Sequence, residues 1–193
     1  MEEKLKRLDS ILVNKKNPII TNLLFPEKEE DIKDLINACK LSINKEFLDF
    51  FMWKDGIDSS LLFSEKGYEF ELSSFGNFFE IRGLLSHYTL EFRTGMIYDK
   101  KYLAIFFSAT GDRILIDLGE KSSSFGKLFI FAPSVTLSDK PMQIFESISF
   151  MIETIIECYE NMAYIISEGK LTVNYELESK IAKRINPNAE FWQ

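Results

Sequence analysis

The spacing of apolar residues changes twice along this 193-residue chain, and each change limits the folds that the chain can adopt. Up to about residue 60, and again from residue 143, apolar residues recur every three or four positions, which is typical of amphipathic helices. Between about residues 60 and 132 they alternate with polar residues or form short continuous runs, which is typical of strands. Helices on both sides of a block of strands predict an α+β fold.

Three helices are expected before residue 60. The first covers residues 2–13 and ends at Asn17-Pro18. The second begins near Pro26, where a proline and the acidic residues after it suit the first turn of a helix. The third follows Asn44, a favoured N-cap residue, and Gly56 is expected to end it. The buried face of this third helix is predicted to contain Phe47, Leu48, Phe50, Phe51, Met52 and Trp53.

The central block predicts an antiparallel or mixed β-sheet meander. Tyr68–Leu72 alternates apolar and acidic residues, as a half-buried strand does. Tyr102–Phe107 is almost continuously apolar and predicts a strand buried on both faces. A turn at residues 110–112 leads to a returning strand at 113–118, and residues 127–131 add a third strand.

The pattern of residues 143–167 predicts a long helix of about seven turns that packs on the sheet. Residues 76–98 have no clear assignment, although Arg82–Phe92 fits a helix. We expect a single domain over residues 1–193, with its core at about 20–167 and a C-terminal extension at 168–193 that has a weak helical pattern.

The composition excludes several classes of function. The net charge of −7 disfavours direct binding to nucleic acid, because an acidic surface repels phosphate groups, and it favours cationic partners. The two cysteines have no spacing that indicates a disulfide framework. With no apolar run that resembles a secretory signal or a membrane span, the sequence predicts a cytoplasmic protein without membrane insertion.

Little in the sequence indicates an enzyme. The one histidine, His87, belongs to no metal-binding motif, and no glycine-rich phosphate-binding loop occurs, so we expect no metal, no cofactor and no catalytic residues. An enzyme remains an alternative in two forms. One would use paired carboxylates, Glu69 with Glu71 or Asp112 with Asp117. The other would pair His87 with Cys39 or Cys158.

Four aromatic residues stand beside glycine, serine or asparagine in segments that look like loops. Aromatic side chains next to carboxylates can form a surface that binds another protein, with apolar anchors inside an acidic rim. Packing in the core is the competing interpretation for each of them. These residues are Phe75, Phe78, Phe79 and Phe125.

The order of four segments resembles that of the SUKH superfamily. Pro26-x-x-Glu29-Glu30 is similar to the family's "P-x-x-E-E-I" helix. The helix after Ile43 is similar to its "L-P-x-x-[YF]-x-x-F-[LF]" helix, and Lys54-Asp55-Gly56 to its "N-G-G" turn. Leu103–Leu118 looks like its "A-x-x-G-G-D" turn and the strand after it. The helix at 147–156 and the end at 186–192 complete the likeness. Asn44 departs from the usual proline, and each turn has one glycine where the family has two.

The resemblance implies a mixed α+β domain that has no catalytic residues and binds another protein. Bacterial members of the superfamily are similar to immunity proteins that bind and neutralise a cognate secreted toxin, often a nuclease or deaminase, and fungal members regulate cell-wall glucan synthesis. We therefore expect a toxin-neutralising immunity protein, with a regulatory interaction module as the alternative. Gly56, Gly111 and Asp112 correspond to structural turn positions in the family.

An acidic surface around the Gly56 turn is the predicted binding site for the protein partner. Acidic side chains there could meet a basic toxin and, if the toxin is a nuclease, could take the place of substrate phosphates. The predicted partner-binding residues are Asp55, Asp58, Glu65, Glu69 and Glu71.

Overall fold

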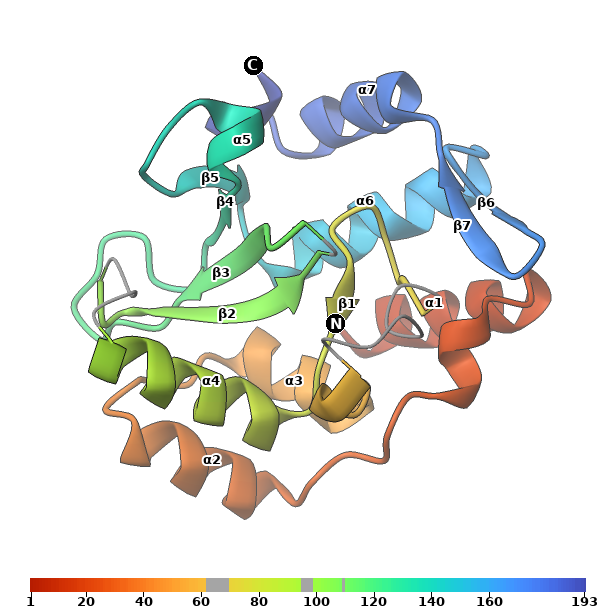
Figure 1. Cartoon of the computed structure of the whole chain (residues 1–193). Helices are drawn as coiled ribbons and strands as arrows, with labels where there is room; N and C mark the ends of the chain where they lie inside the picture. Colours follow the sequence, from red (N-terminus) through yellow and green to blue (C-terminus); the bar gives the residue numbers. More distant parts are fainter. Residues whose placement is uncertain (62–69, 95–98, 109) are drawn as a thin grey trace.

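The computed structural model describes residues 1–61, 70–94, 99–108 and 110–193. A five-stranded antiparallel sheet lies between helices, and a separate two-stranded hairpin follows later in the chain (Figure 1). The helices are α1 (Glu2–Asn14), α2 (Glu29–Ala38), α3 (Lys45–Trp53), α4 (Ile81–Thr94), α5 (Pro133–Thr136), α6 (Ile148–Glu160) and α7 (Tyr175–Ile185). The short 3-10 helices are η1 (Pro18–Thr21), η2 (Ser59–Leu61) and η4 (Glu190–Trp192). The strands are β1 (Asn77–Phe78), β2 (Tyr102–Phe107), β3 (Arg113–Asp117), β4 (Leu128–Phe131), β5 (Met142–Phe145), β6 (Tyr164–Ser167) and β7 (Lys170–Val173). The predicted α+β class is confirmed.

The large sheet is an antiparallel meander in the order β1-β2-β3-β4-β5. The three strands predicted from residue 102 to residue 131 correspond to β2, β3 and β4 within one or two residues. β2 is buried along almost its whole length, as its continuous apolar run predicts. The turn after β2 needs Gly111, whose φ of +87° is easily adopted only by glycine.

α3 brings the central aromatic residues of the core together. Asn44 begins the helix as predicted, because its side chain accepts a hydrogen bond from the Phe47 backbone N–H at 2.7 Å. The Phe50 ring lies 4.8 Å from the ring of Phe78 and 6.3 Å from that of Phe106, which joins the helix to β1 and β2. Met52 was predicted to widen the buried face, but it is exposed on another side of the helix.

The predicted long helix at 143–167 is wrong at both ends. α6 covers only Ile148–Glu160; β5 precedes it and β6 follows it. An apolar residue every four positions fits a helix and also fits one face of a strand, so spacing alone cannot separate the two. Met162 ends the helical stretch because it has a left-handed backbone with φ of +62°.

The strand predicted at Tyr68–Leu72 is also wrong as far as the structure describes it. Residues 68 and 69 lie outside the described residues, and residues 70–72 have no strand conformation. The backbone carbonyl groups of this segment accept hydrogen bonds from side chains of distant segments and not from a neighbouring strand. Asn17 donates to the Glu71 carbonyl at 3.2 Å, and the Tyr159 hydroxyl donates to the Leu72 carbonyl at 3.0 Å.

Packing of the helices extends the core to both ends of the chain. α1 packs on α6, α2 packs on α4, and α4 packs on β2. α4 begins one residue before the helix that Arg82–Phe92 suggested. One cluster of buried apolar side chains runs from Leu5 to Trp192, so it includes α1 and the segment after residue 168. Among the described residues, no helix is long and apolar enough to cross a membrane.

Candidate binding site

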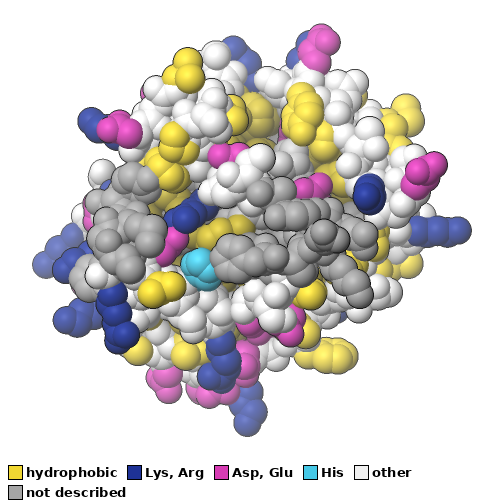
Figure 2. Space-filling model, viewed as in Figure 1, with side chains coloured by type: hydrophobic (Ala, Val, Ile, Leu, Met, Phe, Trp, Pro, Cys, Tyr) yellow, Lys and Arg dark blue, Asp and Glu magenta, His cyan; other side chains and the backbone are white. Residues whose placement is uncertain are grey.

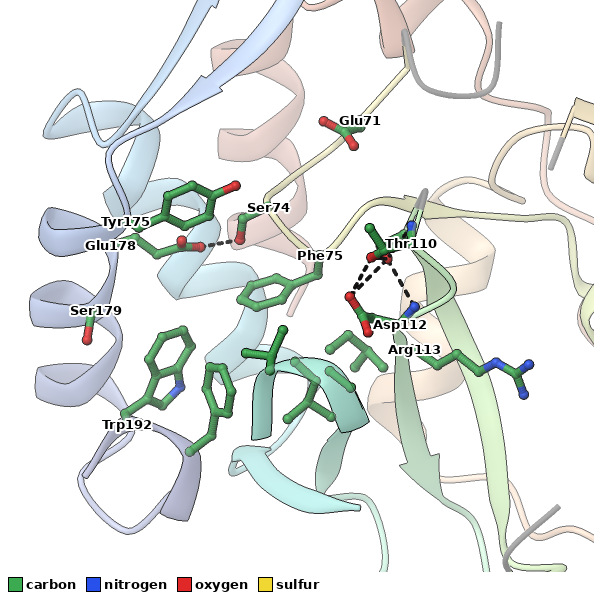
Figure 3. A pocket seen from close by; sticks show the side chains of 16 residues that line it. Glu71, Ser74, Phe75, Thr110, Asp112, Arg113, Tyr175, Glu178, Ser179 and Trp192 are labelled. Carbon is green, nitrogen blue, oxygen red and sulfur yellow. Dashed lines mark hydrogen bonds between the residues drawn. The ribbon is translucent and has the colours of Figure 1, made fainter. Parts of the chain in front are cut away.

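A pocket of about 590 Å³ opens beside the tip of the β2–β3 hairpin (Figure 3). Its walls come from the 71–75 segment, the hairpin tip, α5, the first turns of α7 and the C-terminal η4. Pockets of roughly 300–1,000 Å³ are the usual size of ligand sites in proteins. The pocket is therefore large enough to receive a group from another molecule.

The hairpin tip places Asp112 at the pocket. The Ser108 backbone N–H donates to the Asp112 carbonyl at 2.9 Å, which closes the turn. The Thr110 hydroxyl donates to the Asp112 carboxylate at 2.6 Å and fixes its orientation. Asp112 therefore takes part in the hairpin turn, and it also lines the pocket.

α7 supplies a buried carboxyl group. Asn174 caps the helix by accepting the Leu177 N–H at 3.1 Å, and Glu178 then lies one turn into the helix. The Glu178 carboxyl accepts hydrogen bonds from the hydroxyl groups of Ser74 and Tyr164. Burial raises the pKa of Glu178, although these two hydrogen bonds act in the opposite direction.

Aromatic side chains form much of the apolar wall. The Trp192 indole N–H donates to the Ile144 carbonyl at 2.8 Å, which holds the C-terminal segment against β5. The Phe75 ring lies 6.2 Å from the Trp192 ring, and the Phe191 ring lies 4.7 Å from it. Tyr175, on the first turn of α7, lines the same pocket.

Large apolar side chains are also exposed at the pocket and next to its lining in the sequence. Val135 and Tyr175 line the pocket and are 61% and 70% exposed, and Leu137, two residues beyond Val135, is 91% exposed. We call Val135, Leu137 and Tyr175 the apolar rim. Figure 2 shows hydrophobic side chains at the surface over the region of α5 and α7. Such a group is expected where another protein binds.

The charged side chains of the pocket are mostly acidic. Glu71, Asp112 and Glu178 line it, together with Arg113. The Arg113 guanidinium pairs with Glu91 and lies 5.7 Å from the Phe107 ring. Figure 3 shows that the Arg113 side chain extends away from the pocket. Among the described residues that line the pocket, no cation therefore faces these carboxyl groups.

The three predicted partner-binding residues that the structure describes, Asp55, Asp58 and Glu71, do not form one surface. Asp55 is buried, and its carboxylate accepts the Ile81 N–H at 2.8 Å at the start of α4. The prediction of an exposed Asp55 is therefore wrong, since the fold uses this carboxylate to satisfy a helix N-terminus. Asp58 is exposed and accepts the Ser60 N–H at 2.8 Å. Glu71 lines the pocket, and Glu65 and Glu69 lie outside the described residues.

The structure also separates the four aromatic candidates. Phe75, Phe78 and Phe79 are buried in the core, and only Phe75 lines the pocket. Phe125 is exposed. On the face shown in Figure 2, acidic and basic side chains are interspersed, so the net negative charge is not gathered there into one acidic surface.

Sequence reasoning missed Glu178, Tyr175 and Trp192 as members of a site. A signal for Glu178 was present, because a glutamate occupies the same helical face as Ile181 and Ala182, which are buried. A carboxyl group on the apolar face of a helix needs polar partners in the interior. Those partners, Ser74 and Tyr164, are distant in sequence and could not be identified beforehand.

The thiols are poorly suited to nucleophilic catalysis. Burial raises the pKa of Cys158 to about 12, and burial also raises the pKa of Cys39. A thiolate is the reactive form of cysteine, so a raised pKa lowers reactivity at neutral pH. Within the described ranges, no group of three or more histidine, cysteine or acidic residues is placed to hold a metal ion.

Comparison with protein-family models gives no match to this chain, and comparison with curated protein sequences gives no significant match. The resemblance to the SUKH superfamily therefore stays a prediction.

Proposed function

We propose that this chain is a protein-binding domain that binds and neutralises a cognate bacterial toxin. The observation that carries the proposal is the apolar rim beside an acidic pocket. Val135 and Tyr175 are mostly exposed at the pocket, and Leu137, two residues beyond Val135, is exposed as well. Burying such side chains against a partner stabilises a complex by about 25 cal/mol for each Å² of apolar surface removed from water.

A protein partner explains the rim better than a small molecule does. Leu137 lies outside the pocket lining, so a ligand confined to the pocket would leave it exposed. A protein surface can fill the pocket with one side chain and cover the rim with its neighbours. The apolar anchors would then slow dissociation, while polar groups around them would set the orientation.

The net charge and the family resemblance support a toxin as the partner. A chain with a charge of −7 attracts a basic protein over a distance longer than a contact, and this raises the association rate. The order of the segments resembles that of proteins that neutralise toxins. A regulatory interaction module would use the same rim with a different partner, so the identity of the captured protein separates the two functions.

The test is affinity capture with the tagged chain from its own cells, followed by a toxicity assay. We expect a basic toxin domain to be captured, and co-expression of this chain to protect cells from that domain. Tyr175→Ala should reduce both capture and protection. Phe25→Ala is the matched control, because Phe25 is 90% exposed and is not part of the rim.

Each outcome decides between the functions. Capture of a toxin with protection that Tyr175→Ala weakens supports the proposal. Equal effects of Tyr175→Ala and Phe25→Ala would refute the rim as the binding surface. Capture only of cell-envelope or signalling proteins, without protection, would refute neutralisation and favour the regulatory module.

A further inference from the structure

The pocket has an unbalanced set of charges. Glu71 and Asp112 reach it from different segments, and Glu178 lines it from α7. Among the described residues, the Glu71 side chain makes no hydrogen bond or ion pair, and burial raises its pKa. The neighbouring cation, Arg113, pairs with Glu91 instead. A carboxyl group that loses water without gaining a partner is unfavourable, and a positive charge in the pocket would remove this cost.

The apolar walls favour an organic cation over a metal ion. Aromatic faces attract a cationic group within about 6 Å of the ring centre, and Tyr175 and Trp192 offer such faces on the side of α7 and η4. The carboxyl groups of the pocket are not clustered for a metal ion, as far as the described residues show. The lining thus combines the two features that bind a flat or alkyl-bearing cation.

An arginine side chain fits this lining best. Its guanidinium group is planar, stacks on aromatic rings and donates paired hydrogen bonds to a carboxylate, whereas a lysine ammonium acts as a compact and strongly hydrated charge. Glu71 and Asp112 stand on one side of the pocket and the rings of Tyr175 and Trp192 on the other, with Glu178 beside Tyr175 (Figure 3). A guanidinium can contact both sides at once.

We propose that the pocket receives an arginine side chain of the protein partner, with Glu71 and Asp112 binding the guanidinium and Tyr175 and Trp192 contacting its face and stem. The residues that flank this arginine in the partner would cover the apolar rim. This inference rests on the proposed protein-binding function and adds the chemistry that the site recognises.

The experiment uses N-acetyl-arginine amide as the probe and N-acetyl-citrulline amide as its neutral counterpart of similar shape. Binding is followed by the two indole N–H signals in nitrogen-15 NMR spectra. Trp192 is in the pocket, whereas Trp53 donates to Asp9 at 2.9 Å and serves as the internal reference. Trp53→Phe assigns the two signals.

We expect the arginine probe to shift the Trp192 signal and leave that of Trp53 in place. The citrulline probe should bind at least about tenfold more weakly, since it cannot make charge-assisted hydrogen bonds. Glu71→Gln combined with Asp112→Asn should weaken the arginine probe by a similar factor. Asp58→Asn, which removes an exposed carboxylate elsewhere, should have no effect.

Any one of three results would overturn the arginine site: equal binding of the two probes, no shift of the Trp192 signal, or full binding by the double variant. Circular dichroism and the unshifted Trp53 signal show whether the double variant is folded. Failure of the two proposals can be told apart. A toxin captured equally by the wild type and the double variant would refute the arginine site alone. A probe that binds the pocket without any captured partner would refute the proposed function alone.

Discussion

Asp55 is a buried carboxyl group that the fold uses as a hydrogen-bond acceptor. It accepts the Ile81 N–H, and burial, together with the nearby charges of Glu27 and Glu80, raises its pKa from 3.8 to about 7. The folded protein therefore binds a proton more tightly than the unfolded chain does. Between pH 3.8 and about 7 this group makes the free energy of unfolding fall as the pH rises, and above that range the loss is complete.

Asp55→Asn should remove this loss. Asparagine keeps an oxygen that can accept the Ile81 N–H, but it does not ionise. We expect the variant to be more stable than the wild type at pH 8 by as much as about 4 kcal/mol, and the difference to shrink towards pH 5. Urea unfolding at the two pH values measures it, with Asp58→Asn as the exposed control. A difference that is the same at both pH values would contradict the expected titration.

Leu137 combines two unfavourable features for a leucine. It is 91% exposed, and it ends α5 with a left-handed backbone whose φ is +53°. Glycine is the residue that usually occupies such a position after a helix. Neither packing nor backbone conformation within this chain explains the side chain, which agrees with a role in contacting a partner.

Leu137→Gly should therefore separate stability from binding. We expect a gain of about 1 kcal/mol in the free energy of unfolding, because the strain of the left-handed conformation disappears. Capture of the partner should weaken at the same time. Met162→Gly is the matched control, since Met162 is 65% exposed, has φ of +62° and stands outside the rim. Unchanged capture by Leu137→Gly would exclude Leu137 from the interface.

Elements whose apolar spacing fits only one type of secondary structure were predicted well. The run in β2 is too short for a helix and is followed by a glycine turn, so it could only be a strand. The phenylalanines of α3 share one helical face after a capping asparagine. The spacing around residues 144–167 fits both a helix and a strand, so the ends of the predicted helix concealed β5 and β6. β1 has two residues, which is too few for any periodic signal.

The Asn44 cap should contribute to the stability of α3. Asn44→Ala removes the acceptor for the Phe47 N–H while leaving the aromatic side chains in place. We expect a loss of about 1 kcal/mol in the free energy of unfolding, measured with urea. Asn188→Ala, at an exposed position after α7, should change it by less than about 0.5 kcal/mol. Equal losses in the two variants would mean that the cap contributes little.

At the scale of the whole molecule, the pocket is a product of long-range packing. Glu71, Asp112 and Glu178 come from segments that no sequence motif relates, and the sheet and α7 bring them together. Of the three acidic residues predicted to bind a partner that the structure describes, Asp55, Asp58 and Glu71, only Glu71 lies at this pocket. Net charge could be counted from the sequence, but its distribution over the surface depends on the fold.

The charge of the whole chain and the apolar rim should affect different rate constants for binding to a captured basic partner. Raising the salt concentration from about 50 mM to about 500 mM screens the long-range attraction and should lower the association rate by about tenfold. Dissociation should change little. Tyr175→Ala should instead speed dissociation, because it removes a short-range contact. Surface plasmon resonance measures both rates, and an association rate that does not depend on salt would exclude electrostatic steering.

The unequal burial of the two thiols makes the chain convenient for fluorescent labelling. Cys158 is fully buried, and its pKa of about 12 keeps it protonated, whereas Cys39 is partly exposed at the end of α2. Burial also raises the pKa of Cys39, but its partial exposure should let a maleimide dye attach to native protein there in preference to Cys158, without any substitution. α2 and α7 lie on opposite sides of the large sheet (Figure 1), so the dye would report partner binding without covering the pocket.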